Sequence, residues 1–285
     1  MTPAAAAALD EPGQAVRAAG ADLGDAIHAE WTKLRTLAGT YWLLLGAMVV
    51  TIGVGAAVAG SFSCPPSACT LAQTGADPAK ISLTGVYLGQ AVVAVLAVLA
   101  VGNEYSTGMI RVTLTAMPRR LTMLSAKAVV LAGCALAAGV VAVLGSVLAA
   151  GTILPGRGLT TANGYPLLSL TNGTDLRAAV GAVLYLMLVA LFALGLTMAV
   201  RESAVAMGAI LALIYLFPLA SALIGDQVWS RRLDQIGLLP AGLDVQATVN
   251  VRSLSLTPWQ GLGVVALWAV GALLLGGLAL RFRDA

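Results

Sequence analysis

The sequence predicts an all-α, polytopic membrane protein with six transmembrane helices, and two observations lead to this prediction. Charged residues make up only 10% of the 285 residues, while hydrophobic residues make up 59%. An ordinary soluble protein carries about 25% charged residues, so this chain has too few charges to cover a surface that faces water everywhere. Six stretches are also continuously apolar over roughly 20 residues, the length that a helix needs to cross the hydrocarbon layer. The strands of a membrane barrel would instead alternate apolar and polar residues.

The six apolar stretches divide the chain into spans and connections. They lie at about 41–60, 83–102, 127–154, 178–200, 203–225 and 259–280. The fourth and fifth are separated only by Arg201 and Glu202, which predicts a tight charged turn. Residues 1–24 contain a short apolar run with no basic residue before it, so we expect a disordered cytoplasmic tail and no cleaved signal peptide.

The distribution of lysine and arginine predicts the orientation of the spans, because cytoplasmic loops carry an excess of these residues. If the N-terminus is cytoplasmic, ten of the 16 lysine and arginine residues fall on the inside and six on the outside. The densest group, between Arg111 and Lys127, also falls on the inside. We therefore expect a multi-pass protein of the cell membrane with both termini in the cytoplasm.

The three cysteines fit this orientation. Cys64 and Cys69 lie together in the predicted first outside loop, in the sequence Cys-Pro-Pro-Ser-Ala-Cys. An outside compartment permits disulfides, which favours a bridge between them. Two free thiols are the alternative, because sequence spacing does not establish the bond geometry. Cys134 lies inside the third span and is interpreted as a small packing residue.

The segment 25–38, just before the first span, predicts an amphipathic helix. Four apolar residues share one stripe of this helix: Ile27, Trp31, Leu34 and Ala38. Three charged residues lie off the stripe: Glu30, Lys33 and Arg35. Tryptophan suits the head-group zone of a bilayer, so we expect this helix to lie in the plane of the membrane interface. A soluble cytoplasmic helix that packs on a partner is the alternative.

The segment 103–120, which reads NEYSTGMIRVTLTAMPRR, predicts a short cytoplasmic helix between the second and third spans. Four of its residues would share one helical face: Glu104, Gly108, Arg111 and Thr115. Tyr105 would lie on a neighbouring face. Pro118 would end the helix, because the residue before proline disfavours the helical region. Arg119 and Arg120 would then anchor the chain at the inner surface; an ordinary basic loop without a partner is the alternative.

These two segments resemble the ATP-binding-cassette exporter permeases of the second type (ABC-2). The sequence AEWTKLRT, residues 29–36, is similar to the start of those proteins, and NEYSTGMIRVTLTAMPRR is similar to the segment after their second span. The order of elements is also similar, with an interfacial helix, six spans, a cytoplasmic loop after the second span and a long outer loop before the sixth. The resemblance covers nearly the whole chain and implies that residues 25–285 form one ABC-2-type transmembrane permease domain.

The resemblance implies roles for particular residues. The helix before the first span would be the elbow helix, represented by Ile27, Trp31, Lys33, Leu34 and Arg35. The segment after the second span would contain the coupling helix, which docks on a separate ATPase subunit, and the residues implied in this contact are Glu104, Tyr105, Gly108, Arg111, Thr115, Arg119 and Arg120. The outer segment 226–257 would hold short re-entrant or gate helices. Such permeases work as dimers, so a second permease copy is expected, either identical or different.

The sequence lacks the motifs for ATP hydrolysis and for a multi-histidine metal site. None of the lysines, Lys33, Lys80 and Lys127, follows a glycine as the Gly-Lys-Ser/Thr phosphate loop requires. The single histidine, His28, cannot form a multi-histidine metal site. We therefore expect no catalytic residue, metal or cofactor on this chain, no nucleic-acid binding, and ATP with magnesium bound by the partner ATPase. The expected function is the permease subunit of an ATP-driven exporter; an ATP-independent carrier or channel, or a membrane scaffold, is the alternative.

Overall fold

A computed structural model describes residues 11–63, 70–109 and 120–282, and the regular elements in these ranges are all helices. Six of the helices are long and apolar enough to cross a membrane. They are α3 (Ala38–Ser61), α6 (Val86–Ser106), α8 (Arg120–Ile153), α9 (Gly173–Val200), α10 (Ser203–Leu223) and α13 (Pro258–Phe282). The prediction of an all-α polytopic membrane protein with six spans is confirmed. Cys64, Cys69 and the predicted cytoplasmic helix beyond Met109 lie outside the described residues.

The spans are longer than the apolar stretches that predict them. Helix α8 begins at Arg120 rather than near Lys127, so Lys127 lies about two turns inside the helix. Hydropathy marks only the part of a helix that suits lipid, while the helix itself continues until its backbone hydrogen bonding stops. The predicted turn between α9 and α10 is confirmed: Arg201 ends α9 with a positive φ of 64°, and the Glu202 carboxylate accepts hydrogen bonds from the N–H groups of Ala204 and Val205.

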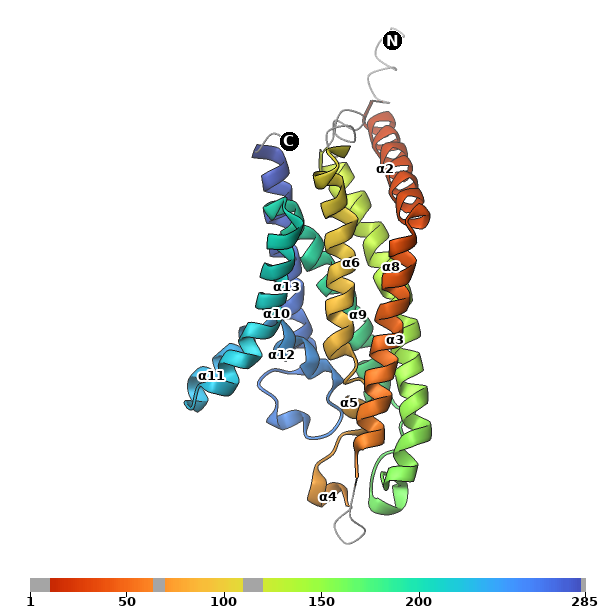
Figure 1. The fold of residues 1–285 in the computed structure, drawn as a ribbon, viewed down its shortest axis with the longest axis vertical. Helices are drawn as coiled ribbons and strands as arrows, with labels where there is room; N and C mark the ends of the chain where they lie inside the picture. Colours follow the sequence, from red (N-terminus) through yellow and green to blue (C-terminus); the bar gives the residue numbers. More distant parts are fainter. Residues whose placement is uncertain (1–10, 64–69, 110–119, 283–285) are drawn as a thin grey trace, which may run out of the picture.

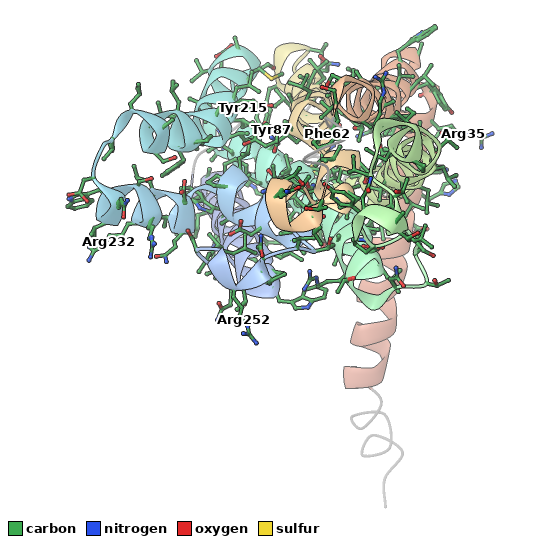
Figure 2. The ribbon with its side chains drawn as sticks, turned by 90° about the horizontal axis from the view of Figure 1, so that it is seen from below. Arg35, Phe62, Tyr87, Tyr215, Arg232 and Arg252 are labelled. Atoms are coloured by element: carbon green, nitrogen blue, oxygen red, sulfur yellow. The ribbon has the colours of Figure 1, made fainter. Side chains whose placement is uncertain are left out.

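The N-terminal helix α2 (Glu11–Thr36) is longer than expected. The expectation of a disordered tail through residue 24 is wrong for residues 11–24, because this alanine-rich sequence favours helix and continues α2 towards the N-terminus. Leu37 has an extended backbone, with φ −85° and ψ 109°, and separates α2 from α3. The N-terminal part of α2 therefore leaves the bundle obliquely, as Figures 1 and 2 show. Its position in a membrane interface stays a prediction.

Helix α9 is the centre of the bundle. In the most apolar stretch of each helix, 67% of the residues of α9 are buried inside the protein, compared with 22% for α3 and 17% for α10. Helix α9 packs against α6, α8 and α13, while α10 lies at the edge and leads into α11 (Gln227–Ile236), which projects away from the bundle (Figure 1). The start of α2 and the end of α13 lie at the same end of the bundle, called here the α2 end (Figure 1).

The opposite end of the bundle carries short helices. They are α4 (Leu71–Thr74), α5 (Pro78–Ser82), η1 (Leu154–Arg157), η2 (Thr161–Asn163), α11, α12 (Leu238–Leu243), η3 (Asp244–Gln246) and η4 (Val251–Ser253). Asp77 joins two of these regions, because its carboxylate caps α5 and also accepts hydrogen bonds from Thr248 Oγ1 at 2.7 Å and Val249 N at 2.9 Å. Short helices within 226–257 are therefore present, while their action as a gate stays a prediction.

Close backbone packing joins α9 to α13. A Cβ atom on Gly195 would overlap the backbone of Ala272 and Leu273, and a Cβ atom on Gly276 would lie 2.6 Å from the Gly195 carbonyl oxygen. The two helices therefore approach as closely as they do only because both positions lack a side chain. Small residues at such contacts are a usual way for helices to associate in lipid.

We predict that Gly195→Ala lowers the thermal unfolding midpoint of the purified protein in detergent. The added methyl group must push α13 away, and overpacking of this kind costs about 1–3 kcal/mol. Gly271→Ala in α13 is the matched control, because its Cβ would meet nothing within 4 Å. Circular dichroism checks the prediction, and equal midpoints for the two variants would show that the close contact contributes nothing.

Candidate functional site

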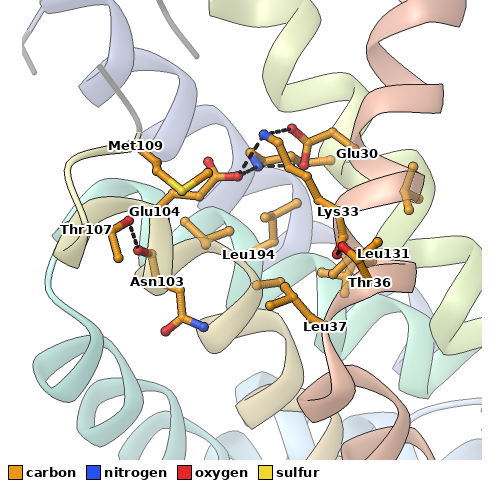
Figure 3. A pocket seen from close by; sticks show the side chains of 15 residues that line it. Glu30, Lys33, Thr36, Leu37, Asn103, Glu104, Thr107, Met109, Leu131 and Leu194 are labelled. Atoms are coloured by element: carbon orange, nitrogen blue, oxygen red, sulfur yellow. Dashed lines mark hydrogen bonds and ion pairs between the residues drawn. The ribbon is translucent and has the colours of Figure 1, made fainter. Parts of the chain in front are cut away.

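Four charged side chains from three helices meet near the α2 end of the bundle. Glu30 and Lys33 come from α2, Glu104 comes from α6, and Lys127 comes from α8. Lys127 Nζ lies 2.7 Å from Glu30 Oε2 and 2.6 Å from Glu104 Oε1. Lys33 Nζ lies 2.9 Å from Glu30 Oε1 and 3.1 Å from the same Glu104 Oε1. Figure 3 shows these contacts, and the four residues are called here the ion-pair cluster.

The ion-pair cluster is almost completely buried. The side chains of Lys127, Glu30 and Glu104 are only 4%, 5% and 8% exposed, while Lys33 is 31% exposed and lies at the rim. A charge in such a place is costly unless it is paired and hydrogen-bonded. Two carboxylates and two ammonium groups make the cluster neutral. Partial burial lowers the pKa of Lys33, but the hydrogen bonds and negative charges of Glu30 and Glu104 outweigh it and raise that pKa above its ordinary value.

The face of α2 that packs on the bundle differs from the predicted stripe. Its buried residues are Ala26, Glu30 and Leu34, whereas Trp31 is 48% exposed. Glu30, which the sequence places off the apolar stripe, is nevertheless buried against the bundle. A buried carboxylate is acceptable on the inner face because Lys33 and Lys127 neutralise it.

A second group of contacts lies at the same end of the bundle, around Tyr105. The Tyr105 hydroxyl donates to Met198 Sδ at 3.7 Å, and the Arg201 guanidinium lies 6.0 Å from the centroid of the Tyr105 ring. Arg201 Nη2 also donates to the Ala279 carbonyl at 2.7 Å, and Arg120 Nη1 donates to the Leu280 carbonyl. The two arginines thus bind carbonyls at the C-terminal end of α13, which have no partner within that helix.

The residues predicted for the cytoplasmic helix are only partly brought together. Glu104 and Tyr105 belong to the last turn of α6, and Arg120 begins α8. Gly108 lies after the end of α6 with a positive φ of 70°, so the expectation that Glu104 and Gly108 share one helical face is wrong. Three further residues of that prediction lie outside the described residues: Arg111, Thr115 and Arg119.

The residues predicted for the elbow helix lie on different sides of α2. Ile27 and Leu34 pack around Val130 and Cys134 of α8, and Lys33 belongs to the ion-pair cluster. Trp31 and Arg35 are exposed, and Figure 2 shows Arg35 pointing away from the bundle.

Sequence reasoning did not assign Glu30 and Lys127 to a site. A signal for Lys127 was present, because an ionisable residue inside a span requires a partner in the bundle. The hydropathy reading missed the signal because it treated Lys127 as the boundary of the third span rather than as part of it.

A cavity of about 380 Å³ lies beside the ion-pair cluster (Figure 3). Its apolar wall comes from Leu34, Leu37, Ala100, Val101, Met109, Val130, Leu131 and Leu194. The ion-pair cluster forms one polar end, and Thr36, Asn103 and Thr107 add polar groups. Glu104 Oε2 is buried and has no hydrogen-bond partner among the described residues.

The opposite end of the bundle holds a second cavity, lined by Lys80, Asp234, Asp244 and neighbouring residues. Burial raises the pKa of the Asp244 carboxyl to a net value of about 6, and the negative charge of Asp234 acts in the same direction. The positive charge of Lys80 and a hydrogen bond from the Leu256 backbone act in the opposite direction. Within the ranges that the structure describes, no group of three or more His, Cys, Asp or Glu residues could hold a metal ion.

The fold and the ion-pair cluster together define a polytopic α-helical membrane protein with a buried, neutral group of four charges at the α2 end. No protein-family model matches the chain, and no curated protein matches it either. Its function must therefore be inferred from its own residues and their arrangement.

We predict that Lys127→Met destabilises the protein by about 3–5 kcal/mol, because it leaves two buried carboxylates with a single ammonium group. Thermal unfolding in detergent, followed by tryptophan fluorescence, measures the loss. Lys33→Met is the matched control and should cost less, because Lys33 is 31% exposed and water screens the change. A Lys127→Met midpoint equal to that of the wild type would contradict the importance of the ion-pair cluster.

We predict that Asp244→Asn stabilises the protein more at pH 7.5 than at pH 4.5. The pKa of Asp244 is about 6 in the folded protein, above the ordinary value of 3.8, so folding favours the protonated form and Asp244 progressively costs stability as the pH rises from 3.8 to about 6. Asparagine resembles the protonated form at every pH. Unfolding midpoints at both pH values test this, with Asp25→Asn on the exposed side of α2 as the control; an equal gain at both pH values would count against it.

Proposed function

We propose that this chain is the permease subunit of an ATP-driven exporter of the ABC-2 type, with the α2 end in the cytoplasm. The observation that carries the proposal is the anchoring of the connection between α6 and α8. On one side, Glu104 and Tyr105 fix the end of α6 to other helices, and on the other side Arg120 fixes the start of α8 to α13. A segment held at both ends in this way can transmit a force to the bundle.

The contacts define two routes for such a force. Through Glu104, the connection reaches Lys127 of α8 and Lys33 of α2. Through Tyr105 and Arg120 it reaches the end of α9 and the last carbonyls of α13. A rigid displacement of the connection would therefore move α6 together with α2, α8, α9 and α13, and rigid-body movement about packed interfaces is a common switching mode.

The source of the force would be a separate ATPase subunit. The sequence contains no Gly-Lys-Ser/Thr phosphate loop, so this chain would contribute no catalytic residue, and ATP with magnesium would bind to the partner. The resemblance of NEYSTGMIRVTLTAMPRR to the coupling segment of ABC-2 permeases supports docking at this connection. The basic residues Arg111, Arg119 and Arg120 belong to this proposed docking segment.

A second permease copy, identical or different, would complete the complex in the cell membrane. The apolar stretches of α3 and α10 are the least buried of the six, at 22% and 17%. These two helices therefore offer the largest apolar surface for lipid or a second copy. Lysine and arginine are also more frequent in the segments at the α2 end, which supports cytoplasmic termini.

The main alternative, an ion-driven carrier, has less support. Carriers of this kind place ionisable groups within their spans, where ions or protons bind. In the described spans the buried charged residues are Glu104 and Asp175, which lie near helix ends, and Lys127, which lies about two turns inside α8 and is neutralised by Glu30 and Glu104. The polar contact between Tyr185 and Gln90, deeper in the bundle, joins two uncharged side chains. A membrane scaffold without transport activity is a further alternative, and the anchored connection gives no reason to prefer it.

We predict that Arg111→Glu reduces the amount of ATPase subunit that co-purifies with the tagged protein from native membranes several-fold. The substitution reverses a charge in the segment proposed to dock on the ATPase, without touching the spans. Quantitative mass spectrometry of the purified complex measures the ATPase per copy of the permease.

Arg252→Glu is the matched control, because it reverses an exposed charge at the opposite end of the bundle (Figure 2). It should leave co-purification unchanged, and both variants should insert into the membrane in normal amounts. If no ATPase accompanies the wild-type protein, or if the purified protein transports solute without any partner, the proposed function is wrong.

A further inference from the structure

The cavity beside the ion-pair cluster has the chemical character of a site for an amphiphile. One end is formed by buried charges, and most of the remaining wall is apolar. Its volume of about 380 Å³ lies within the range in which proteins bind small molecules. Several lining residues are exposed: Thr36, Leu37, Asn103, Thr107 and Met109. The mouth therefore lies between the bend at Leu37 and the end of α6.

Glu104 specifies what the polar end of the cavity can bind. Its side chain is 8% exposed, and Oε1 accepts from both lysines, while Oε2 has no hydrogen-bond partner among the described residues. A buried acceptor left unpaired is costly, so the site favours a ligand that brings an N–H or O–H donor. In Figure 3 the Glu104 side chain lies beside that of Met109.

Lys33 favours a ligand that also carries an anionic group. Its ammonium carries three N–H donors, and two of them are used on Glu30 and Glu104. The side chain is 31% exposed, so the third donor is available at the rim. The cluster is already neutral, and a ligand with a lone positive charge would leave an uncompensated charge there. A head group with both an ammonium and an anionic group satisfies Glu104 and Lys33 and keeps the site neutral.

The position of the cavity points to a membrane lipid as the source of this head group. Three exposed aromatic residues lie on the neighbouring segments of α2 and α3: Trp31, Tyr41 and Trp42. Exposed tryptophan and tyrosine side chains of this kind mark the level of the lipid head groups. The wall of the cavity is mostly apolar and includes the buried residues Leu34, Val101 and Leu131, which suits the start of an acyl chain.

We propose that this cavity binds one membrane phospholipid with a primary amine, a phosphatidylethanolamine, in the leaflet at the α2 end. The ammonium donates to Glu104 Oε2, the phosphate accepts from Lys33, and the start of one acyl chain lies along Leu34, Ala100 and Val130. A quaternary ammonium cannot donate a hydrogen bond, so phosphatidylcholine satisfies only the Lys33 contact. This assignment does not depend on the proposed transport function, because lipid binding requires no ATPase.

Native mass spectrometry of the delipidated full-length protein in detergent tests the proposal. Phosphatidylethanolamine, phosphatidylcholine and phosphatidylglycerol with identical dioleoyl chains are added separately, and the protein with one bound lipid is quantified. We expect about ten-fold tighter binding of one phosphatidylethanolamine than of one phosphatidylcholine, the ratio that a single charge-assisted hydrogen bond provides.

Ala100→Phe fills the cavity without altering the ion-pair cluster, and it should abolish this preference. Ala137→Phe is the matched control, because Ala137 is an exposed residue of α8 and its substitution should leave the preference intact. Equal binding of phosphatidylethanolamine and phosphatidylcholine would overturn the role of Glu104. Tighter binding of phosphatidylglycerol would indicate an anion site at Lys33 instead, and an unchanged preference in Ala100→Phe would overturn the location.

Discussion

Lys127 places an ammonium group about two turns inside a membrane-crossing helix, and much of the structure near the α2 end follows from the need to neutralise it. Neither hydrocarbon nor a packed protein interior solvates a charge, so the ammonium must meet carboxylates at hydrogen-bonding distance. Glu104 provides one from α6 and Glu30 provides the other from α2. Two carboxylates around one ammonium would leave a net negative charge, and Lys33 removes it. The position of α2 on the bundle is therefore determined by charge as well as by its few apolar contacts.

The other side of the bundle is held by a different physical interaction. Helices α9 and α13 meet through Gly195 and Gly276, where the backbones approach closely and no charge is involved. Aromatic packing adds to this contact, since Phe192 and Trp268 lie edge to face with centroids 6.0 Å apart. The contact between α9 and α13 is stabilised by dispersion forces, which require that the two surfaces fit closely. The ion-pair cluster is stabilised by charge, which requires a partner of opposite sign at a short distance. Tyr105 and Arg201 connect the two regions, because they join the end of α6 to the ends of α9 and α13.

The parts of this structure that the sequence predicts correctly are those that depend on local patterns. The six spans follow from runs of apolar residues, and the turn at Arg201 and Glu202 follows from two charges between two such runs. The ion-pair cluster could not be predicted in the same way, since Glu30, Glu104 and Lys127 are separated by 74 and 23 positions and meet only after α2, α6 and α8 have packed. The burial of Glu30 could not be predicted for a related reason: a carboxylate is polar by itself but becomes acceptable inside once Lys127 faces it.

The same ion pairs connect the two proposals made for this protein. A connection that transmits force needs a stiff attachment, and a buried neutral cluster with short contacts between three helices provides one without any exchange of protons. The cavity adjoins this attachment and contains residues of both α2 and α6, so a displacement of one helix relative to the other changes its shape. A lipid that fits the present cavity binds this arrangement of α2 and α6 more tightly than an arrangement in which one helix has moved. The difference between the two affinities stabilises the present arrangement. The composition of the surrounding leaflet would thus affect how readily the connection between α6 and α8 moves the bundle.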